Sequence, residues 1–218
     1  MSHPQQQRLA EGATALGLNL SAAQHAQLLA YLDLLAKWNK VYNLTAVRDP
    51  AEMLTHHLLD SLAVIAPLVR HTQGGAARVL DVGSGGGLPG VVIAICCPEM
   101  SVACVDAVAK KAAFVQQAAG VLGLSNLRGV HARVESITEP YDVITSRAFA
   151  TLADFTQWSA GSLGEDGVWM AMKGKHPAEE MGVLPAGVQV FHVEQLTVPG
   201  LDAQRCIVWM RKSAPATT

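Results

Sequence analysis

The sequence predicts an α/β protein: a mostly parallel sheet with helices on both faces, preceded by a helical extension. Two patterns support this fold class. Over residues 1–73, apolar residues recur at helical intervals. From Arg78 onward, short apolar runs alternate with amphipathic segments, as in the repeated β-α units of a parallel sheet. We therefore divide the chain into a helical extension at 1–73, a main domain at 74–212 and a disordered tail at 213–218.

Start signals define the helices of the extension. The first predicted helix covers residues 9–16. The second begins at Ser21, and Gln24 stands three residues later, which is the spacing of a capping box. The third follows Asp49 and Pro50, carries Glu52 in its first turn, and continues through "AEMLTHHLLDSLAVIAPLV".

The main domain is predicted to alternate strands and helices. The predicted strands cover 77–82, 101–107, 126–134, 141–148, 166–174, 187–198 and 204–212. The predicted helices cover 91–97, 110–124 and 153–163. Because the last two strands follow each other without a long helix, we expect an antiparallel addition at one edge of the sheet.

Composition limits the location and the partners of the protein. A net charge of −2 excludes binding to nucleic acid by overall charge alone, so a nucleic-acid substrate requires basic residues gathered on one face. The N-terminus has no apolar signal core, and no run reaches the roughly 18 apolar residues of a membrane helix. We expect a cytoplasmic monomer without a membrane or protein partner.

The four cysteines are expected to be buried and reduced. Cys96 and Cys97 are adjacent, while Cys104 and Cys206 lie in apolar runs, and no pair has the spacing of a zinc or redox motif. A nucleophilic cysteine in "CCP" (96–98) is disfavoured, because this stretch ends a predicted helix away from the carboxyl ends of the strands.

The stretch "LDVGSGGGLPG" (80–90) is the main candidate binding site, because ligands of an open α/β sheet bind beyond the carboxyl ends of its strands. No lysine follows the glycines, which excludes a P-loop for a triphosphate. A nicotinamide dinucleotide is disfavoured, because the carboxylate of Asp81 before the glycines repels a pyrophosphate. S-adenosylmethionine, a sulfonium nucleoside without phosphate, fits better, and we place Asp81 among its contacts.

Residues after the first three strands are the other candidate cofactor contacts. Gly83, Ser84 and Gly85 would form the turn that lets the backbone approach the ligand. Asp106, at the end of the second strand, would accept hydrogen bonds from the ribose hydroxyls. Val134 would pack on the adenine, with a core position as an equal alternative. Glu135 or nearby backbone would meet the adenine amino group.

Several motifs occur in an order that resembles one protein family. They are "KWNKVYNLTAVRDP" (37–50), "HHLLDSLAV" (56–64), "LDVGSGGGLPGVVIA" (80–94), "RVE" (133–135), "SRAFA" (146–150) and "MKG" (172–174). From about residue 20 to 211, the chain resembles the RsmG family, also called glucose-inhibited division protein B. "GLPG" followed by "SRAFA" is its most specific part. Ser84 stands where threonine is common in that family, which keeps the hydroxyl group.

The resemblance implies a Rossmann-like class I S-adenosylmethionine-dependent methyltransferase with a seven-stranded, mostly parallel sheet and an N-terminal helical extension. It implies cofactor contacts from Gly83, Leu88, Val134, Glu135 and Arg147. It also implies methyl transfer to N7 of a guanine, position 527, in the 530 loop of 16S ribosomal RNA of the small subunit.

The residues themselves are consistent with that chemistry. Guanine N7 carries a free lone pair, so in-line displacement requires positioning and electrostatics and no general base. "SRAFA" follows the fourth strand, where amino-methylating enzymes commonly carry Asn/Asp-Pro-Pro-Tyr/Phe, which argues against an amino target. The alternatives are methyl transfer to another RNA or to a small molecule, and a nucleotide-binding module without catalysis.

Arg147 and Lys173 are the candidate catalytic residues. Arg147 could pair with guanine O6, a phosphate or the cofactor carboxylate, with a structural salt bridge as the alternative. Lys173 ends the fifth predicted strand and could contact phosphate, or be solvated. Phe149 could stack on an extruded base, although core packing is the simpler interpretation.

The extension supplies the other candidate contacts to RNA. They are Lys37, Asn43, Arg48 and His56, which could form a basic rim with Arg147 and Lys173. Ordinary surface charge, and a turn role for Asn43, are the alternatives. His56, His57 and Asp60 have metal-ligand spacing without a partner cluster, so we predict no metal site, and we expect Asp60 and Ser61 to brace the extension against the glycine loop.

Overall fold

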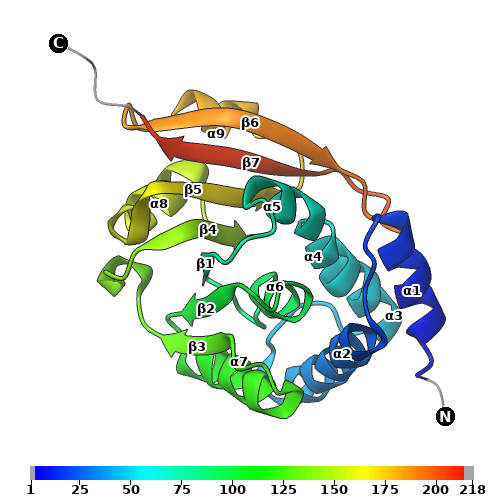
Figure 1. Cartoon of the computed structure of the whole chain (residues 1–218). Coiled ribbons are helices and arrows are strands. Elements are labelled where there is room, and N and C mark those ends of the chain that lie inside the picture. The colour runs from blue at the N-terminus through cyan, green and yellow to red at the C-terminus, as the bar shows by residue number, and fades with distance from the viewer. Residues whose placement is uncertain (1–2, 214–218) are drawn as a thin grey trace.

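The computed structural model describes residues 3–213 and contains a seven-stranded sheet (Figure 1). Its strands are β1 (Arg78–Val82), β2 (Ser101–Asp106), β3 (Leu127–His131), β4 (Tyr141–Arg147), β5 (Leu163–Lys173), β6 (Val188–Leu196) and β7 (Arg205–Lys212). The order across the sheet is β3-β2-β1-β4-β5-β7-β6. Strands β1 to β5 pair in parallel, and β7 is antiparallel to both β5 and β6. The predicted parallel sheet with an antiparallel addition at one edge is confirmed.

Helices precede the sheet and connect its strands. Those of the extension are α1 (Gln6–Ala15), α2 (Ala22–Tyr42), α3 (Pro50–Met53), a π-helical segment (Leu54–Leu59), α4 (Asp60–Leu62) and α5 (Ile65–His71). Those of the main domain are α6 (Gly90–Cys96), α7 (Ala109–Leu122), α8 (Leu152–Ser159) and α9 (Ala178–Gly182). Figure 1 shows α1 to α4 gathered at one side of the sheet, with α8 and α9 beside β4 to β6.

Side chains that alternate along the strands divide the core into two layers. On β1, Val79 belongs to the layer that includes α1, α2, α6 and α7, while Leu80 and Val82 belong to the layer that includes α8. The first layer runs without a break from Leu9 in α1 to Trp209 in β7. Helices therefore cover both faces, as predicted, and the extension shares a hydrophobic core with the sheet.

Helix α2 docks on the ends of two main-domain helices. Gln24 Nε2 donates to the carbonyl oxygens of Ile95 and Cys96 at the end of α6 (3.0 and 3.2 Å). Gln27 Nε2 donates to the carbonyl oxygen of Leu122 at the end of α7 (2.9 Å). Carbonyl groups in the last turn of a helix have no partner within it, so α2 satisfies groups that would otherwise need water.

Hydrogen bonds confirm two predicted helix starts. Ser21 and Gln24 form the capping box at the start of α2. Asp49 Oδ1 accepts from two backbone N–H groups at the start of α3 (2.8 and 3.1 Å). Gly123 ends α7 in the left-handed conformation with φ of +67°.

Other features differ from the prediction. The third helix of the extension is interrupted by the π-helical segment, a type of turn that is frequent at functional sites. Strand β3 ends at His131, so Val134 lies in a 3₁₀ turn (Val134–Ser136) and not on a strand. Helix α9 was not predicted, because the five residues that follow Pro177 are too few to show a helical period. Residues 214–218 of the predicted disordered tail lie outside the described residues.

Candidate active site

The glycine loop turns sharply after β1. Gly83 and Gly85 have φ of +64° and +58°, a region that favours glycine. The amide of Gly85 donates to Asp106 Oδ2 (3.0 Å), which joins the loop to the end of β2. A Cβ atom on Gly83 would lie 2.0 Å from Phe149 Cδ2, so this position has no room for a side chain.

Two cavities flank the loop and meet at Gly83 and Ala148, which line both. The Asp106 cavity, of about 410 Å³, lies over the ends of β1, β2 and β3. The Arg147 cavity, of about 510 Å³, lies between the glycine loop, the extension and the ends of β4 and β5. The two cavities thus form neighbouring compartments at the carboxyl ends of the parallel strands.

The Asp106 cavity offers hydrogen-bond acceptors. Asp106 Oδ1 accepts from Val108 N (2.9 Å), and Oδ2 accepts from Gly85 N. The ammonium group of Lys111 lies 3.9 Å from Oδ2. Because each carboxylate oxygen can accept more than one hydrogen bond, Asp106 can also receive the hydroxyl groups of a ribose.

The other walls of this cavity suit a flat ring. Val134 is buried and apolar, and Glu135 is exposed at the opening. Phe149 packs edge-on against Trp158, with ring centroids 5.8 Å apart and an interplanar angle of 77°. The acceptors and these walls fit the adenosine part of S-adenosylmethionine, and no cation other than Lys111 and Arg133 lines the cavity within the described residues.

A network of ion pairs organises the Arg147 cavity. Arg147 Nη1 donates to Asp60 Oδ2 (2.9 Å) and to the carbonyl oxygen of His56 (2.7 Å). Arg205 Nε donates to Asp60 Oδ1 (2.8 Å). The Asp60 side chain is 4% exposed, so the two guanidinium groups compensate a buried negative charge. The network joins β4, β7 and the extension.

His57 lies against this network as a neutral ring. Its Nε2 lies 2.8 Å from Thr45 Oγ1, and its Nδ1 lies 3.4 Å from Arg147 Nη2. Burial and the neighbouring Arg147 charge lower the pKa of His57 to about 4. The imidazole is therefore uncharged at neutral pH and adds nothing to the positive charge of the cavity.

The Arg147 cavity is positively charged in a chain whose net charge is −2. Histidines aside, its lining contains three cations, Arg147, Lys173 and Arg205, and one carboxylate, Asp60. The carboxylate of Glu180 lies 2.8 Å from Lys173 Nζ and neutralises that cation, so the net charge is +3 − 2 = +1. This concentration of basic groups meets the condition that the composition set for a nucleic-acid substrate.

Comparisons with known proteins identify the family. The chain matches the family model for rRNA small subunit methyltransferase G, GidB, over residues 24–208. It belongs to this family. A relative named ribosomal RNA small subunit methyltransferase G from Acidovorax ebreus is 70% identical over 94% of this chain and 95% of its own length. A relative of the same name from Polaromonas sp. strain JS666 is 68% identical over 97% of this chain and 96% of its own length.

Solved structures share the fold of this methyltransferase. TrmN from Thermus thermophilus superposes with a TM-score of 0.56 at 20% identity, over 70% of this chain and 49% of that one. A mutant of MtNAS in complex with S-adenosylmethionine superposes with a TM-score of 0.60 at 13% identity, over 98% of this chain and 100% of that one. The predicted family and class I methyltransferase fold are confirmed, as is the prediction of an S-adenosylmethionine-dependent rRNA methyltransferase.

The structure places the predicted cofactor residues of this methyltransferase around both cavities. Those that line the Asp106 cavity are Gly83, Asp106, Val134 and Glu135. Those that line the Arg147 cavity are Gly83, Ser84, Gly85, Leu88 and Arg147. Phe149, a predicted substrate contact, lines the Asp106 cavity and not the Arg147 cavity.

Asp81 lines neither cavity. Its carboxylate is fully buried beneath the loop, where Oδ2 accepts from Gly90 N (2.9 Å) at the start of α6. Burial raises the pKa of Asp81 to about 7. The predicted ligand contact is therefore not what the structure shows: Asp81 supports the turn from β1 into α6.

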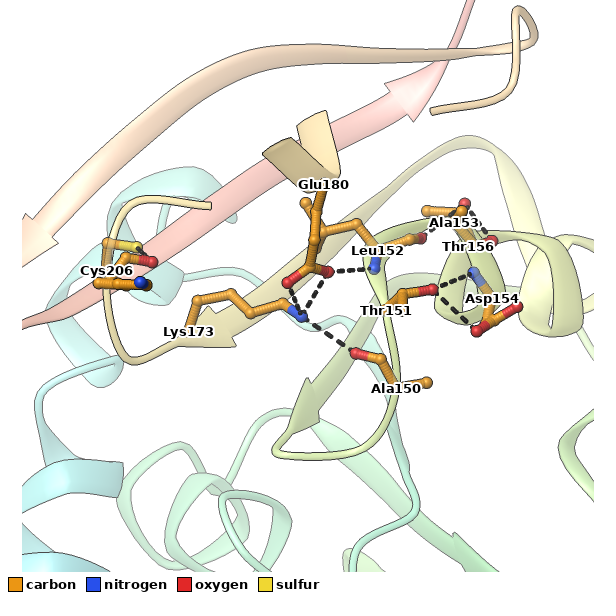
Figure 2. Close-up of polar contacts among 10 residues, drawn as sticks. Ala150, Thr151, Leu152, Ala153, Asp154, Thr156, Lys173, Glu180 and Cys206 are labelled. Carbon is orange, nitrogen blue, oxygen red and sulfur yellow. Dashed lines mark hydrogen bonds and ion pairs between the residues drawn. The ribbon is translucent and has the colours of Figure 1, made fainter. Parts of the chain in front are cut away.

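Lys173 lines the Arg147 cavity, but its ammonium group is bound to protein atoms (Figure 2). Its Nζ donates to both carboxylate oxygens of Glu180 (3.1 and 2.8 Å) and to the carbonyl oxygen of Ala150 (3.0 Å). An ammonium group has three N–H donors, so all of them are engaged. The structure thus shows Lys173 in a structural role, which the sequence did not suggest.

The predicted RNA contacts of the extension are only partly brought together. His56 lines the Arg147 cavity, whereas Lys37, Asn43 and Arg48 are exposed and line neither cavity. Asn43 ends α2 with φ of +49° and accepts from Arg48 Nη2 (3.2 Å), so it has the turn role that was the alternative. Asp60 joins the extension to β4 and β7 through Arg147 and Arg205, and not to the glycine loop as predicted.

Two residues of the site were missed. Arg205 is the first residue of β7 and could have been predicted from the sequence. An antiparallel strand begins at the edge of the sheet where the parallel strands end, which places Arg205 beside Lys173. Glu180 lies in α9, which sequence periodicity could not reveal.

The described residues contain no disulfide and no metal site. The four cysteines are free, and Cys97, Cys104 and Cys206 are buried. Among residues 3–213, no group of three His, Cys, Asp or Glu side chains is arranged to hold a metal ion. No helix in the described part of the chain is long and apolar enough to span a bilayer.

Proposed function

We propose that this chain methylates N7 of a guanine in the 530 loop of 16S ribosomal RNA. The observation that carries the proposal is the meeting of two unlike cavities at Gly83 and Ala148. The Asp106 cavity offers carboxylates and an apolar wall to an adenosine, and the Arg147 cavity offers positive charge to RNA. A methyl group presented at their junction faces the compartment in which an RNA base would lie.

The chain's residues would position the reactants. Asp106 would orient the ribose, while the glycine loop lets the backbone approach the cofactor. Bound S-adenosylmethionine supplies the methyl group and a good leaving group. Arg147 and Arg205, fixed by Asp60, would hold the guanine edge or its phosphates without moving a proton, because N7 carries a free lone pair.

The extension would complete the substrate compartment. Leu35 of α2, the segment after α2 and the π-helical segment all contribute to the lining of the Arg147 cavity. We therefore include residues 1–73 in the RNA-binding part of the enzyme and residues 74–212 in the cofactor-binding part. We further propose that the enzyme is a cytoplasmic monomer acting on the small ribosomal subunit.

Transfer of tritium from labelled S-adenosylmethionine tests the proposal. Small subunits from cells that lack this methylation should accept label at one guanine, detected by cleavage at 7-methylguanosine, and free nucleotides should not. Asp106→Ala should lose cofactor binding, whereas Arg205→Ala should keep it and lose transfer to RNA. Label in a small molecule, in another RNA, or at an exocyclic amino group would contradict the proposal.

A further inference from the structure

One ion pair links three chain segments near the cavities (Figure 2). Glu180, in α9, accepts from the backbone amide of Leu152 (2.7 Å) and from Lys173 Nζ (2.8 Å) through the same oxygen, Oε2. Lys173 Nζ, at the end of β5, also donates to the carbonyl oxygen of Ala150 (3.0 Å). The end of β5, helix α9 and residues 150–152 are therefore held together.

Removing Glu180 would leave two donors unsatisfied. The Lys173 and Glu180 side chains are only 19% and 33% exposed, so water replaces the lost contacts incompletely. Leu152 is the first residue of α8, and its amide has no acceptor within that helix. The carboxylate of Glu180 thus anchors both the start of α8 and the ammonium group that holds Ala150.

The segment anchored in this way forms part of both cavities. Ala148 lines both and has φ of +52°, a conformation that residues other than glycine rarely adopt. Phe149 packs beside Gly83 and Trp158. Such a backbone conformation persists only where its surroundings hold it. The Lys173–Glu180 pair holds Ala150 and Leu152, two and four residues further along the chain than Ala148.

We infer that Glu180 is a positioning residue for cofactor binding. Through Lys173 and the Leu152 amide, it fixes residues 148–151 and keeps the Phe149 wall of the Asp106 cavity in place. Glu180 lines neither cavity, so it affects the cofactor only through this loop. The inference rests on the proposed function, because it assigns the adenosine of S-adenosylmethionine to the Asp106 cavity.

Calorimetric titration with S-adenosylmethionine tests the inference in the full-length wild type and three variants, with the melting temperature of each. Glu180→Ala should raise the Kd about tenfold, because two charge-assisted contacts are lost. Glu180→Gln should raise it about threefold, because the amide oxygen still accepts from Leu152 but the ion pair is gone. Glu179→Ala removes an exposed charge from the same helix and should leave the Kd unchanged. In activity assays, the KM for the cofactor should rise in the Glu180 variants and stay constant in Glu179→Ala.

Three results would overturn the inference. A lower melting temperature with an unchanged Kd in both Glu180 variants shows a merely structural ion pair. If the Kd rises equally in Glu179→Ala, the effect comes from the general charge of α9 and not from the Glu180 contacts. If Glu180→Ala does not fold, the Kd of Glu180→Gln tests the inference in its place. If the wild type binds no S-adenosylmethionine, both the proposed function and the inference are wrong. If the wild type binds it and the Glu180 variants have the same Kd, only the inference is wrong.

Discussion

Arg147 donates to the carboxylate of Asp60 across 2.9 Å, and this ion pair joins the end of β4 to the N-terminal extension. Arg205 occupies the other oxygen of the same carboxylate. The extension therefore supplies the counter-ion that orients two cations of the Arg147 cavity. The charge of that cavity depends on how the extension docks, as well as on the residues of the sheet.

Replacing Asp60 by asparagine should weaken both the fold and the site. The two guanidinium groups would lose their buried counter-ion, and we expect the free energy of unfolding to fall by about 2 kcal/mol. The KM for the ribosomal subunit should rise, because Arg147 and Arg205 repel each other. Urea denaturation and transfer assays measure the two effects.

Asp33→Asn is the matched control for that change. Asp33 pairs with His3 at 3.2 Å, but its side chain is 68% exposed. We expect the loss of this exposed pair to lower the free energy of unfolding by less than about 0.5 kcal/mol. If Asp33→Asn and Asp60→Asn lower the free energy of unfolding equally, burial of Asp60 does not explain its effect on stability.

A methyl group at Gly83 should weaken cofactor binding. The added Cβ would lie 2.0 Å from the Phe149 ring, so Gly83→Ala must displace the wall of the Asp106 cavity or distort the loop. Gly123→Ala carries the same conformational cost at φ of +67°, yet its Cβ meets nothing within 4 Å. The left-handed backbone alone should cost each variant about 1 kcal/mol of stability, and the overlap with Phe149 should make the loss larger in Gly83→Ala. Calorimetry should show a Kd for S-adenosylmethionine that is raised more than about tenfold only in Gly83→Ala. A similar Kd in both variants would mean that cofactor binding does not depend on the position of Phe149.

The sheet and the position of the site could be predicted, because they follow from local patterns. The alternation after Arg78 and the glycines at 83–87 each act within a few residues, and both indicate the carboxyl edge of β1. The motif "SRAFA" likewise placed Arg147 at that edge.

The partners of the charged groups could not be predicted, because they come from distant parts of the chain. Asp60 meets Arg147 across 87 residues and Arg205 across 145, and such pairs depend on how three elements pack. Lys173 illustrates the consequence: its place at the end of β5 was correct, but its role changed because the unpredicted α9 brings Glu180 to it. Asp81 was misplaced for a similar reason, since a residue at a strand end can point beneath a loop as well as into a cavity.

Stability should depend on pH through His57. Burial and Arg147 lower its pKa in the folded protein to about 4, whereas an unfolded histidine titrates near pH 6.5, so the unfolded state binds more protons between these values. Stability should therefore fall as the pH decreases from about 6.5 to 4, by at most about 1.4 kcal/mol per pH unit.

Urea denaturation of the wild type and His57→Gln at several pH values isolates this effect. The difference in free energy of unfolding between the two should shrink as the pH falls through that window. His192→Gln, at an exposed position, should show no such change. A pH-independent difference for His57→Gln would mean that the imidazole is not held neutral.

The hydroxyl of Tyr31 tests whether the extension sets the shape of the glycine loop. Tyr31 is fully buried in α2, and its hydroxyl donates to the carbonyl oxygen of Gly86 (2.5 Å). Tyr31→Phe keeps the ring and removes the donor, so stability should fall by about 1 kcal/mol. Because Gly86 belongs to the same loop as Gly83, which lines the Asp106 cavity, the Kd for S-adenosylmethionine should also rise by about threefold.

Tyr42→Phe makes the same chemical change at the end of α2, where the side chain is 39% exposed, and should alter neither quantity. A loss of stability in Tyr31→Phe without a change in Kd would show that α2 only packs against the loop. A change in both would show that the extension, which lies outside the cofactor-binding part of the chain, helps to shape the cofactor site. That result would also explain why α2 places its buried tyrosine against a loop carbonyl, where a phenylalanine would pack equally well.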